Sequence, residues 1–139
     1  MKTSLKFITM FTIAAVSFLF IIGNSAVAQT KAWTVPAADK AMKSPVKLTD
    51  QSVIDNGKEL WAKHCKSCHG AKGLGDGPKA AALKTKVISL TDPAFKSQTD
   101  GDIYYKTNKG RDEMPAYEKK IPDANDRWGL VAYMRFLGK

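Results

Sequence analysis

The chain has 139 residues, with 22 lysines and arginines against 13 aspartates and glutamates, a formal net charge of +9 at pH 7. A surface of this charge favours acidic partners, but the lysines are scattered along the chain and form no basic block, so nucleic acid is not an expected partner. The only two cysteines, Cys65 and Cys68, lie too close in sequence for a disulfide between them to stabilise the fold by closing a long loop.

Residues 1–28 are expected to be a cleavable export signal. Two lysines precede an apolar run over residues 7–22, and Ala26-Val27-Ala28 has the small residues of a signal-peptidase site. The alternative is an uncleaved membrane anchor, although the run is rather short for a span of about 20 residues. Cleavage leaves 111 residues, enough for one compact domain, with a charge of about +7. We therefore expect the protein in the periplasm, and at a membrane only if the signal is retained.

Residues 29–48 are expected to form an extended N-terminal arm, because the segment contains Pro36 and Pro45 and shows no sustained hydrophobic period. Trp33 and Val35 are expected to hold the arm against the domain, since an exposed tryptophan in a loose tail is unusual. Residues 49–139 then make up the folded domain.

Helical periodicity in this domain predicts an all-α fold of three or four short helices with unusually long loops. The first helix is expected to begin at Thr49 or Asp50, both good N-cap residues. Gly57 interrupts its apolar face at a cost of about 1 kcal/mol relative to alanine. Gly57 is therefore a candidate for a close crossing with a second helix.

Loops occupy much of the middle of the domain. The glycines of residues 70–78 break any helix, residues 79–84 are expected to form a short helical turn, and residues 90–95 another loop. Residues 111–122 form a further irregular stretch. A core divided by so much loop is thin, and a large bound apolar group would complete it.

Two more helices follow from their start and stop signals. Thr99 or Asp100 can cap a helix that runs to about Asn108. The last helix is expected to start near Asp123, with Asp126 three residues on as a weak capping box, and to end close to the C-terminus.

The stretch Cys65-Lys66-Ser67-Cys68-His69 carries the chemistry, and three interpretations of it are open. A redox dithiol normally opens a helix after a strand, but here the motif follows a helix and no strand precedes it. A zinc site could use the adjacent His64 as a fourth donor, but structural zinc sites usually take ligand pairs from separate segments. The third interpretation is covalent attachment of haem.

Haem attachment gives both cysteines and the histidine of the motif a role. The thiols of Cys65 and Cys68 add to the two haem vinyl groups, and His69 is brought beneath the iron as its ligand. The glycines that follow allow the backbone to approach the ring closely. We therefore expect one haem c per chain, attached covalently through both cysteines.

The second iron ligand follows from elimination. His64 directly precedes the first thioether cysteine and should not reach the opposite face of the ring. Met42 lies in the arm, and Met134 falls in the apolar pattern of the last helix, where methionine ordinarily packs in the core. Met114 lies in a loop beside Pro115 and is the expected distal ligand, the alternative being a loop methionine without a role.

Three segments, GKELWAKHCKSCHGAKGLGDGP, TDGDIYYKTNKGRDEMPAY and DRWGLVAYMRFLGK, resemble in this order a class I monohaem c-type cytochrome of the bacterial kind. The resemblance covers roughly residues 50–139. It implies a cytochrome c fold whose first and last helices cross over the haem edge, with Gly57 and Tyr133 at the crossing.

The resemblance also implies further residues that would contact the His69 ligand or the haem propionates. Pro78 would accept a hydrogen bond from the ring N–H of His69 through its carbonyl and so fix the ligand's orientation. Arg111 and Trp128 resemble residues that lie near the haem propionates, although a loop arginine is often simply solvated.

With His69 and Met114 both bound, the iron has no open position, so we expect a carrier of single electrons and not an enzyme. Expected partners are redox proteins with acidic surfaces, such as an oxidase, a reductase or a dehydrogenase. Four lysines near the motif are candidates for a docking surface: Lys63, Lys66, Lys72 and Lys79. The alternatives are a haem-based ligand binder or sensor, a peroxidase-like enzyme with a labile sixth ligand, or an electron-transfer subunit of a larger dehydrogenase complex.

Overall fold

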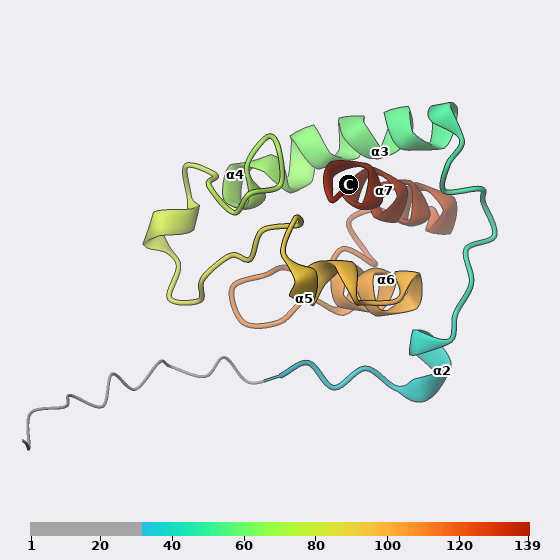
Figure 1. The fold of residues 1–139 in the computed structure, drawn as a ribbon, viewed down its shortest axis with the longest axis horizontal. Coiled ribbons are helices and arrows are strands. Elements are labelled where there is room, and N and C mark those ends of the chain that lie inside the picture. Colours follow the sequence, from blue (N-terminus) through green and yellow to red (C-terminus); the bar gives the residue numbers. More distant parts are fainter. Residues whose placement is uncertain (1–31) are drawn as a thin grey trace, which may run out of the picture. The chain divides into compact units, whose positions relative to one another are not determined.

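A computed structural model describes residues 32–139, and the expected export signal lies outside these residues. Within them the chain is helical or irregular, with no strand and one isolated β-bridge between Arg111 and Met114, which confirms the all-α class. No helix in this part of the chain is long and apolar enough to cross a membrane. The helices in chain order (Figure 1) are α2 (Ala37–Lys40), α3 (Gln51–His64), α4 (Lys66–His69), the 3-10 turn η2 (Ala80–Ala82), α5 (Pro93–Lys96), α6 (Asp100–Lys109) and α7 (Ala124–Leu137).

The three long helices begin at the predicted caps. The Asp50 carboxylate accepts a hydrogen bond from the Ser52 amide at 2.9 Å at the start of α3. Thr99 caps α6, and Asp102 completes a full capping box there. Asp123 caps α7 through the amide two residues on. Each cap satisfies an amide that the helix itself leaves unpaired, so local sequence alone sets these boundaries.

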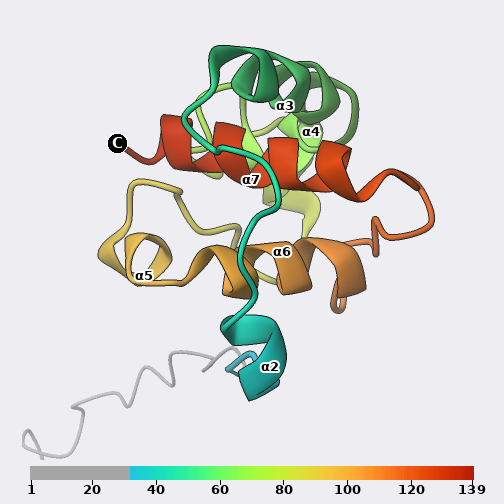
Figure 2. The ribbon, with the colours of Figure 1, turned by 90° about the vertical axis from the view of Figure 1, so that its right-hand side faces the viewer.

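Helices α3 and α7 pack across each other (Figure 2). A Cβ on Gly57 would overlap the carbonyl of Gly129 in α7, which confirms the prediction of a close crossing at Gly57. The predicted capping box at Asp126 is wrong. Its carboxylate instead accepts a hydrogen bond from the Asn56 side chain at 2.7 Å and so joins the two helices.

The core lies between this helix pair and α6. Leu130 and Val131 of α7 are fully buried, and Ile103 of α6 is buried with them. Trp128 stacks on Tyr104 with ring centroids 4.1 Å apart. Burying a large apolar side chain stabilises the fold by about 1.5–3 kcal/mol. These contacts fix α6, and the loop that follows it, relative to α3 and α7.

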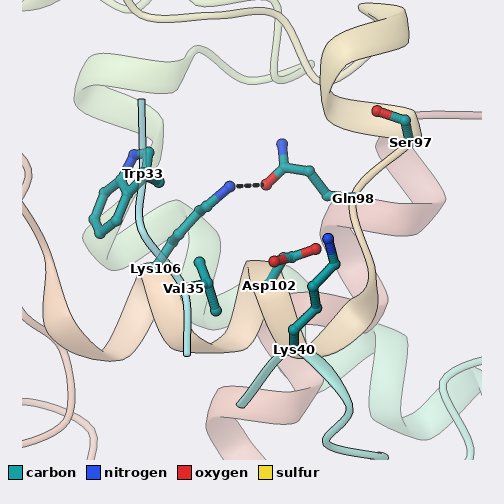
Figure 3. A pocket seen from close by; sticks show the side chains of 7 residues that line it. All are labelled: Trp33, Val35, Lys40, Ser97, Gln98, Asp102 and Lys106. Carbon is teal, nitrogen blue, oxygen red and sulfur yellow. Dashed lines mark hydrogen bonds between the residues drawn. The ribbon is translucent and has the colours of Figure 1, made fainter. Parts of the chain in front are cut away.

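Two short helices were not expected. The arm contains the single turn of α2, which packs on α6, and the loop predicted over residues 90–95 contains the start of α5. A four-residue helix has too few positions to show a hydrophobic period, so sequence reasoning cannot find one. Trp33 and Val35 are half-buried alongside α6 (Figure 3), as the sequence predicts.

Candidate functional site

The motif forms a single helical turn directly after α3. Cys65 is the C-cap of α3, and its carbonyl accepts hydrogen bonds from the amides of Cys68 at 3.2 Å and His69 at 3.0 Å. Residues three and four apart lie on the same side of a helix. Both thiols and the imidazole therefore come from one side of one turn, which is the arrangement needed to hold a flat group at three points.

His69 has the state that an iron ligand needs. Its Nδ1 atom is buried and has no hydrogen-bond partner. Burial lowers the pKa of His69 from its ordinary value, which favours the neutral imidazole that binds metals. Buried polar atoms are nearly always paired, and this nitrogen is the one expected to donate to the Pro78 carbonyl, which leaves the other ring nitrogen to bind a metal.

Trp61 holds this turn from the α3 side. Its ring centroid lies 5.5 Å from that of His69, and its indole N–H donates to the Gly70 carbonyl at 3.0 Å. Nothing in the sequence near Trp61 indicates this hydrogen bond. The only signal for Trp61 itself is its position, one helical turn before Cys65.

The two cysteines are free thiols. Burial, together with the neighbouring Cys68, raises the pKa of Cys65 to about 12, so this thiol stays neutral at neutral pH. A redox dithiol requires the opposite, a thiol whose pKa is lowered. Within residues 32–139, no three histidine, cysteine, aspartate or glutamate side chains converge to hold a metal ion, so the motif does not have the arrangement of a zinc site.

The segment that contains Pro78 lies against the motif. The Gly77 amide donates to the Cys68 carbonyl at 3.2 Å, and a Cβ on Gly77 would lie only 2.7 Å from the same oxygen. Glycine is therefore required for this close approach. The hydrogen bond from His69 to the Pro78 carbonyl is not formed, because Nδ1 has no partner. The role of Pro78 stays a prediction for the haem-bound protein.

Met114 closes a tight turn. The amide of Arg111 donates to the Met114 carbonyl at 2.9 Å, and the Met114 amide donates back to the Arg111 carbonyl at 2.9 Å. The Glu113 carboxylate accepts hydrogen bonds from the amides of Lys84 and Thr85 at 3.1 and 2.9 Å. The turn is therefore fixed internally and tied to the segment after η2, and sequence reasoning missed this second tie.

Tyr117 connects the Met114 segment to the motif. Its hydroxyl donates to the carbonyl of His64, the last residue of α3, at 2.8 Å. Burial, with the nearby thiols of Cys65 and Cys68, raises the pKa of Tyr117 to about 12. The hydroxyl therefore remains a donor at any physiological pH. The structure thus brings Cys65 and Cys68 together in one turn with the haem-ligand candidate, and holds the methionine segment beside that turn through Tyr117.

The remaining methionines lie where the elimination argument requires. Met134 is buried in the core of α7, and Met42 is exposed on the arm. Trp128, which the resemblance placed near the propionates, is buried against Tyr104. Met114 remains the distal ligand candidate.

An all-α domain with a Cys-x-x-Cys-His turn defines the class of c-type cytochromes. The chain belongs to the family described as cytochrome C oxidase, cbb3-type, subunit III, whose model matches residues 52–134. This match confirms the resemblance to monohaem c-type cytochromes, identifies an electron-transfer domain and implies haem c.

A solved structure supports the same fold. The chain is similar, at 27% identity and a TM-score of 0.63, to a chain of the Kuenenia stuttgartiensis reducing HAO-like protein complex. The similarity covers 78% of this chain and 53% of the other, so this chain spans about half the length of its structural relative. No curated protein matches the chain.

The residues present fit haem c. Cys65 and Cys68 supply two thiols from one side of a single turn, and His69 supplies from the same side a half-buried imidazole whose pKa is lowered by burial. Gly77 allows the backbone to pass close to the motif without a side chain in between. These are the donors and the clearance that covalent attachment requires.

Proposed function

We propose that the protein is an exported monohaem c-type cytochrome that carries single electrons between redox partners in the periplasm. Cys65 and Cys68 attach one haem by thioether bonds, and His69 and Met114 are its iron ligands. The observation that carries this proposal is the turn at residues 65–69, which presents two thiols and a half-buried imidazole from one side.

When bound, haem c supplies one-electron chemistry between ferrous and ferric iron, and methionine ligation favours the ferrous state. The chain supplies a fixed ligand set. Burial keeps His69 neutral, and Trp61 packs beside its ring. Two hydrogen bonds between Arg111 and Met114 hold the backbone of the Met114 turn. Because neither ligand has to move, electron transfer requires little reorganisation of the protein.

His64 ends α3 on the motif side, where its ring lies edge-on to Tyr117 with centroids 5.8 Å apart. Burial and the charges of Lys63 and Lys120 lower the pKa of His64. With both iron positions taken by the chain, a carrier is favoured over an enzyme or a ligand sensor.

A second candidate is an electron-transfer subunit of a larger complex. It is favoured by the structural relative, which comes from a protein complex and is about twice as long as the matched region. A free carrier and a subunit can use the same domain. A stable complex that survives gentle purification from the native host would favour the subunit, whereas a free monomer would favour the carrier.

Optical spectroscopy of the exported holoprotein tests the ligand set. We expect the absorption spectrum of the reduced protein to stay unchanged when carbon monoxide is added, because Met114 occupies the sixth position. Met114→Ala should bind carbon monoxide readily, and its oxidised form should lose the weak charge-transfer band of methionine-ligated haem. Met134→Leu is the matched control and should behave as the wild type, since Met134 packs in the core.

Two outcomes would contradict the proposal. A wild-type protein that binds carbon monoxide freely has an open or labile sixth position, which would favour the ligand binder or the peroxidase-like enzyme. A protein without covalent haem would exclude all of these functions.

A further inference from the structure

Trp33 of the arm lies against two cations from the domain. The guanidinium carbon of Arg111 is 4.4 Å from the centre of the indole ring, and Lys106 Nζ is 5.9 Å from it. Figure 3 shows Trp33 on the arm beside Lys106, whose ammonium donates to the Gln98 side chain. A guanidinium stacks well on an aromatic face and is held there by attraction to the ring electrons.

Arg111 is also the first residue of the Met114 turn. Both its backbone amide and its carbonyl are hydrogen-bonded to Met114, so a displacement of Arg111 displaces the methionine. The Arg111 side chain is about one quarter exposed and also pairs with Asp112 at 3.3 Å. Asp112 is largely exposed, and such surface pairs contribute little. The stacking on Trp33 is therefore the stronger restraint on this side chain.

The arm is itself anchored at the other end of α6. The Thr99 hydroxyl donates to the Lys40 carbonyl at 2.8 Å, and a Cβ on Gly101 would overlap the Asp39 carbonyl. The arm thus lies along α6, fixed near its N-terminus by α2, and reaches Arg111 beyond its C-terminus with Trp33. A tryptophan anchored in this way can transmit the position of the arm to the turn.

We propose that the arm is a clamp on the methionine ligand, in which Trp33 is a positioning residue that holds the Met114 turn through Arg111. The inference rests on the proposed His69/Met114 ligation. The arm lies outside the residues matched by the family model, so the clamp joins the matched domain to a segment beyond it. Glu113 ties the turn to the amides of Lys84 and Thr85, and Trp33 ties it to the arm.

Ligand competition on the oxidised holoprotein tests the clamp. Imidazole is titrated while the methionine charge-transfer band is followed, and amide hydrogen exchange is measured over residues 111–116. We expect Trp33→Ala to raise the apparent affinity for imidazole about two- to fivefold, the effect of one lost cation–π contact, and to speed exchange in the turn. Trp33→Phe keeps an aromatic ring and should shift less.

Three further variants make the result specific. Val35→Ala removes a half-buried arm side chain over α6 and should leave the imidazole affinity unchanged. Arg111→Gln should shift the affinity in the same direction as Trp33→Ala, and the double variant should shift it no further than the larger single, because the two residues act through one contact.

The clamp is overturned if Trp33→Ala binds imidazole like the wild type, or if Val35→Ala shifts the affinity equally, since the arm would then act only through general stability. The wild type tests the ligation separately. If its oxidised form lacks the methionine band, the proposed ligand set fails and the clamp fails with it. A wild type with the band and an unshifted Trp33→Ala refutes the clamp alone.

Discussion

Trp61 serves the site with both its ring and its N–H group. The ring is 2% exposed and lies between the imidazole of His69 and the ring of Tyr133, 5.5 and 6.0 Å away by centroids. The indole N–H donates to the carbonyl of Gly70, directly after the motif. Among the aromatic side chains, only tryptophan combines a bicyclic ring with an N–H donor. The residue therefore fixes the end of the Cys-x-x-Cys-His turn while completing the core behind it.

Replacing Trp61 with phenylalanine should destabilise the holoprotein by more than the loss of buried ring area alone would predict. The change leaves the buried Gly70 carbonyl without its indole donor, at a cost of about 1–2 kcal/mol. Denaturant unfolding of the holoprotein measures the free energy. Trp128→Phe is the control, because that equally buried ring is held by stacking on Tyr104. Equal losses in the two variants would mean that the hydrogen bond contributes nothing of its own.

At the scale of helices, the contact between α3 and α7 depends on two glycines that face each other. Gly57 approaches the carbonyl of Gly129 so closely that a single methyl group has no room. In an isolated helix, alanine in place of glycine would stabilise by about 1 kcal/mol. Here the two effects have opposite signs, so the sign of the measured change shows which one dominates.

We expect Gly57→Ala to lower the free energy of unfolding by about 2 kcal/mol, because overpacking a crossing outweighs the gain in helix propensity. Gly129→Ala should cost less, since its Cβ would lie 3.2 Å from the Val53 carbonyl, a tight contact that small shifts can relieve. Thermal unfolding of both holoproteins gives the comparison. A Gly57→Ala protein as stable as the wild type would show that the helices can separate at little cost.

The long helices could be predicted because their signals are local. Asp50 and Thr99 cap amides two and three residues on, and Gly57 marks the crossing by interrupting an apolar face. The family resemblance placed Tyr133 of the last helix at this crossing, and a Cβ on Gly57 would indeed lie 3.0 Å from the Tyr133 Cβ. That Gly129 also faces Gly57 could not be predicted, because nothing near either glycine specifies the other. Helices α2 and α5 were missed because a single turn has no period.

In the site as well, features encoded by neighbouring residues could be predicted, and contacts between distant segments could not. The Cys-x-x-Cys-His turn is encoded in five consecutive residues, and the structure forms it with bonds inside those residues. The supports of the Met114 turn join segments that are distant in sequence. Glu113 bonds to residues 84 and 85, Tyr117 to His64, and Arg111 stacks on Trp33. The sequence shows the chemical groups of these residues but not the folding that brings them together.

At the scale of the whole molecule, positive charge acts on an approaching partner at the longest range. The four lysines expected around the motif, at positions 63, 66, 72 and 79, are all exposed. The chain carries an excess of nine positive charges, of which two lie in the expected signal. Long-range attraction speeds the encounter with an acidic partner and is screened by salt, because the Debye length falls to about 10 Å at 0.1 M. If electrons leave near the motif, these lysines should govern the rate.

The salt dependence of oxidation by small oxidants of opposite charge tests this expectation directly. Oxidation of the reduced holoprotein by ferricyanide, an anion, should slow about tenfold between low and high ionic strength, whereas oxidation by a cationic cobalt complex should speed up. Lys66→Gln/Lys72→Gln should flatten both dependences. Lys43→Gln/Lys47→Gln removes the same charge from exposed positions in the segment after α2, which lies on the opposite side of the domain from α4 (Figure 1), and should have a smaller effect.

Oxidation rates that do not depend on ionic strength would contradict the expectation of a docking surface. Equal effects of the two lysine pairs would show that only net charge matters. A larger effect of the pair beside the motif would locate the electron exit at the face that α4 and its following loop present. That face would then be the one that an acidic oxidase or reductase approaches. It would also be the face that a permanent partner would have to cover if the domain works as a subunit, since charge on the face where electrons leave acts on both kinds of partner.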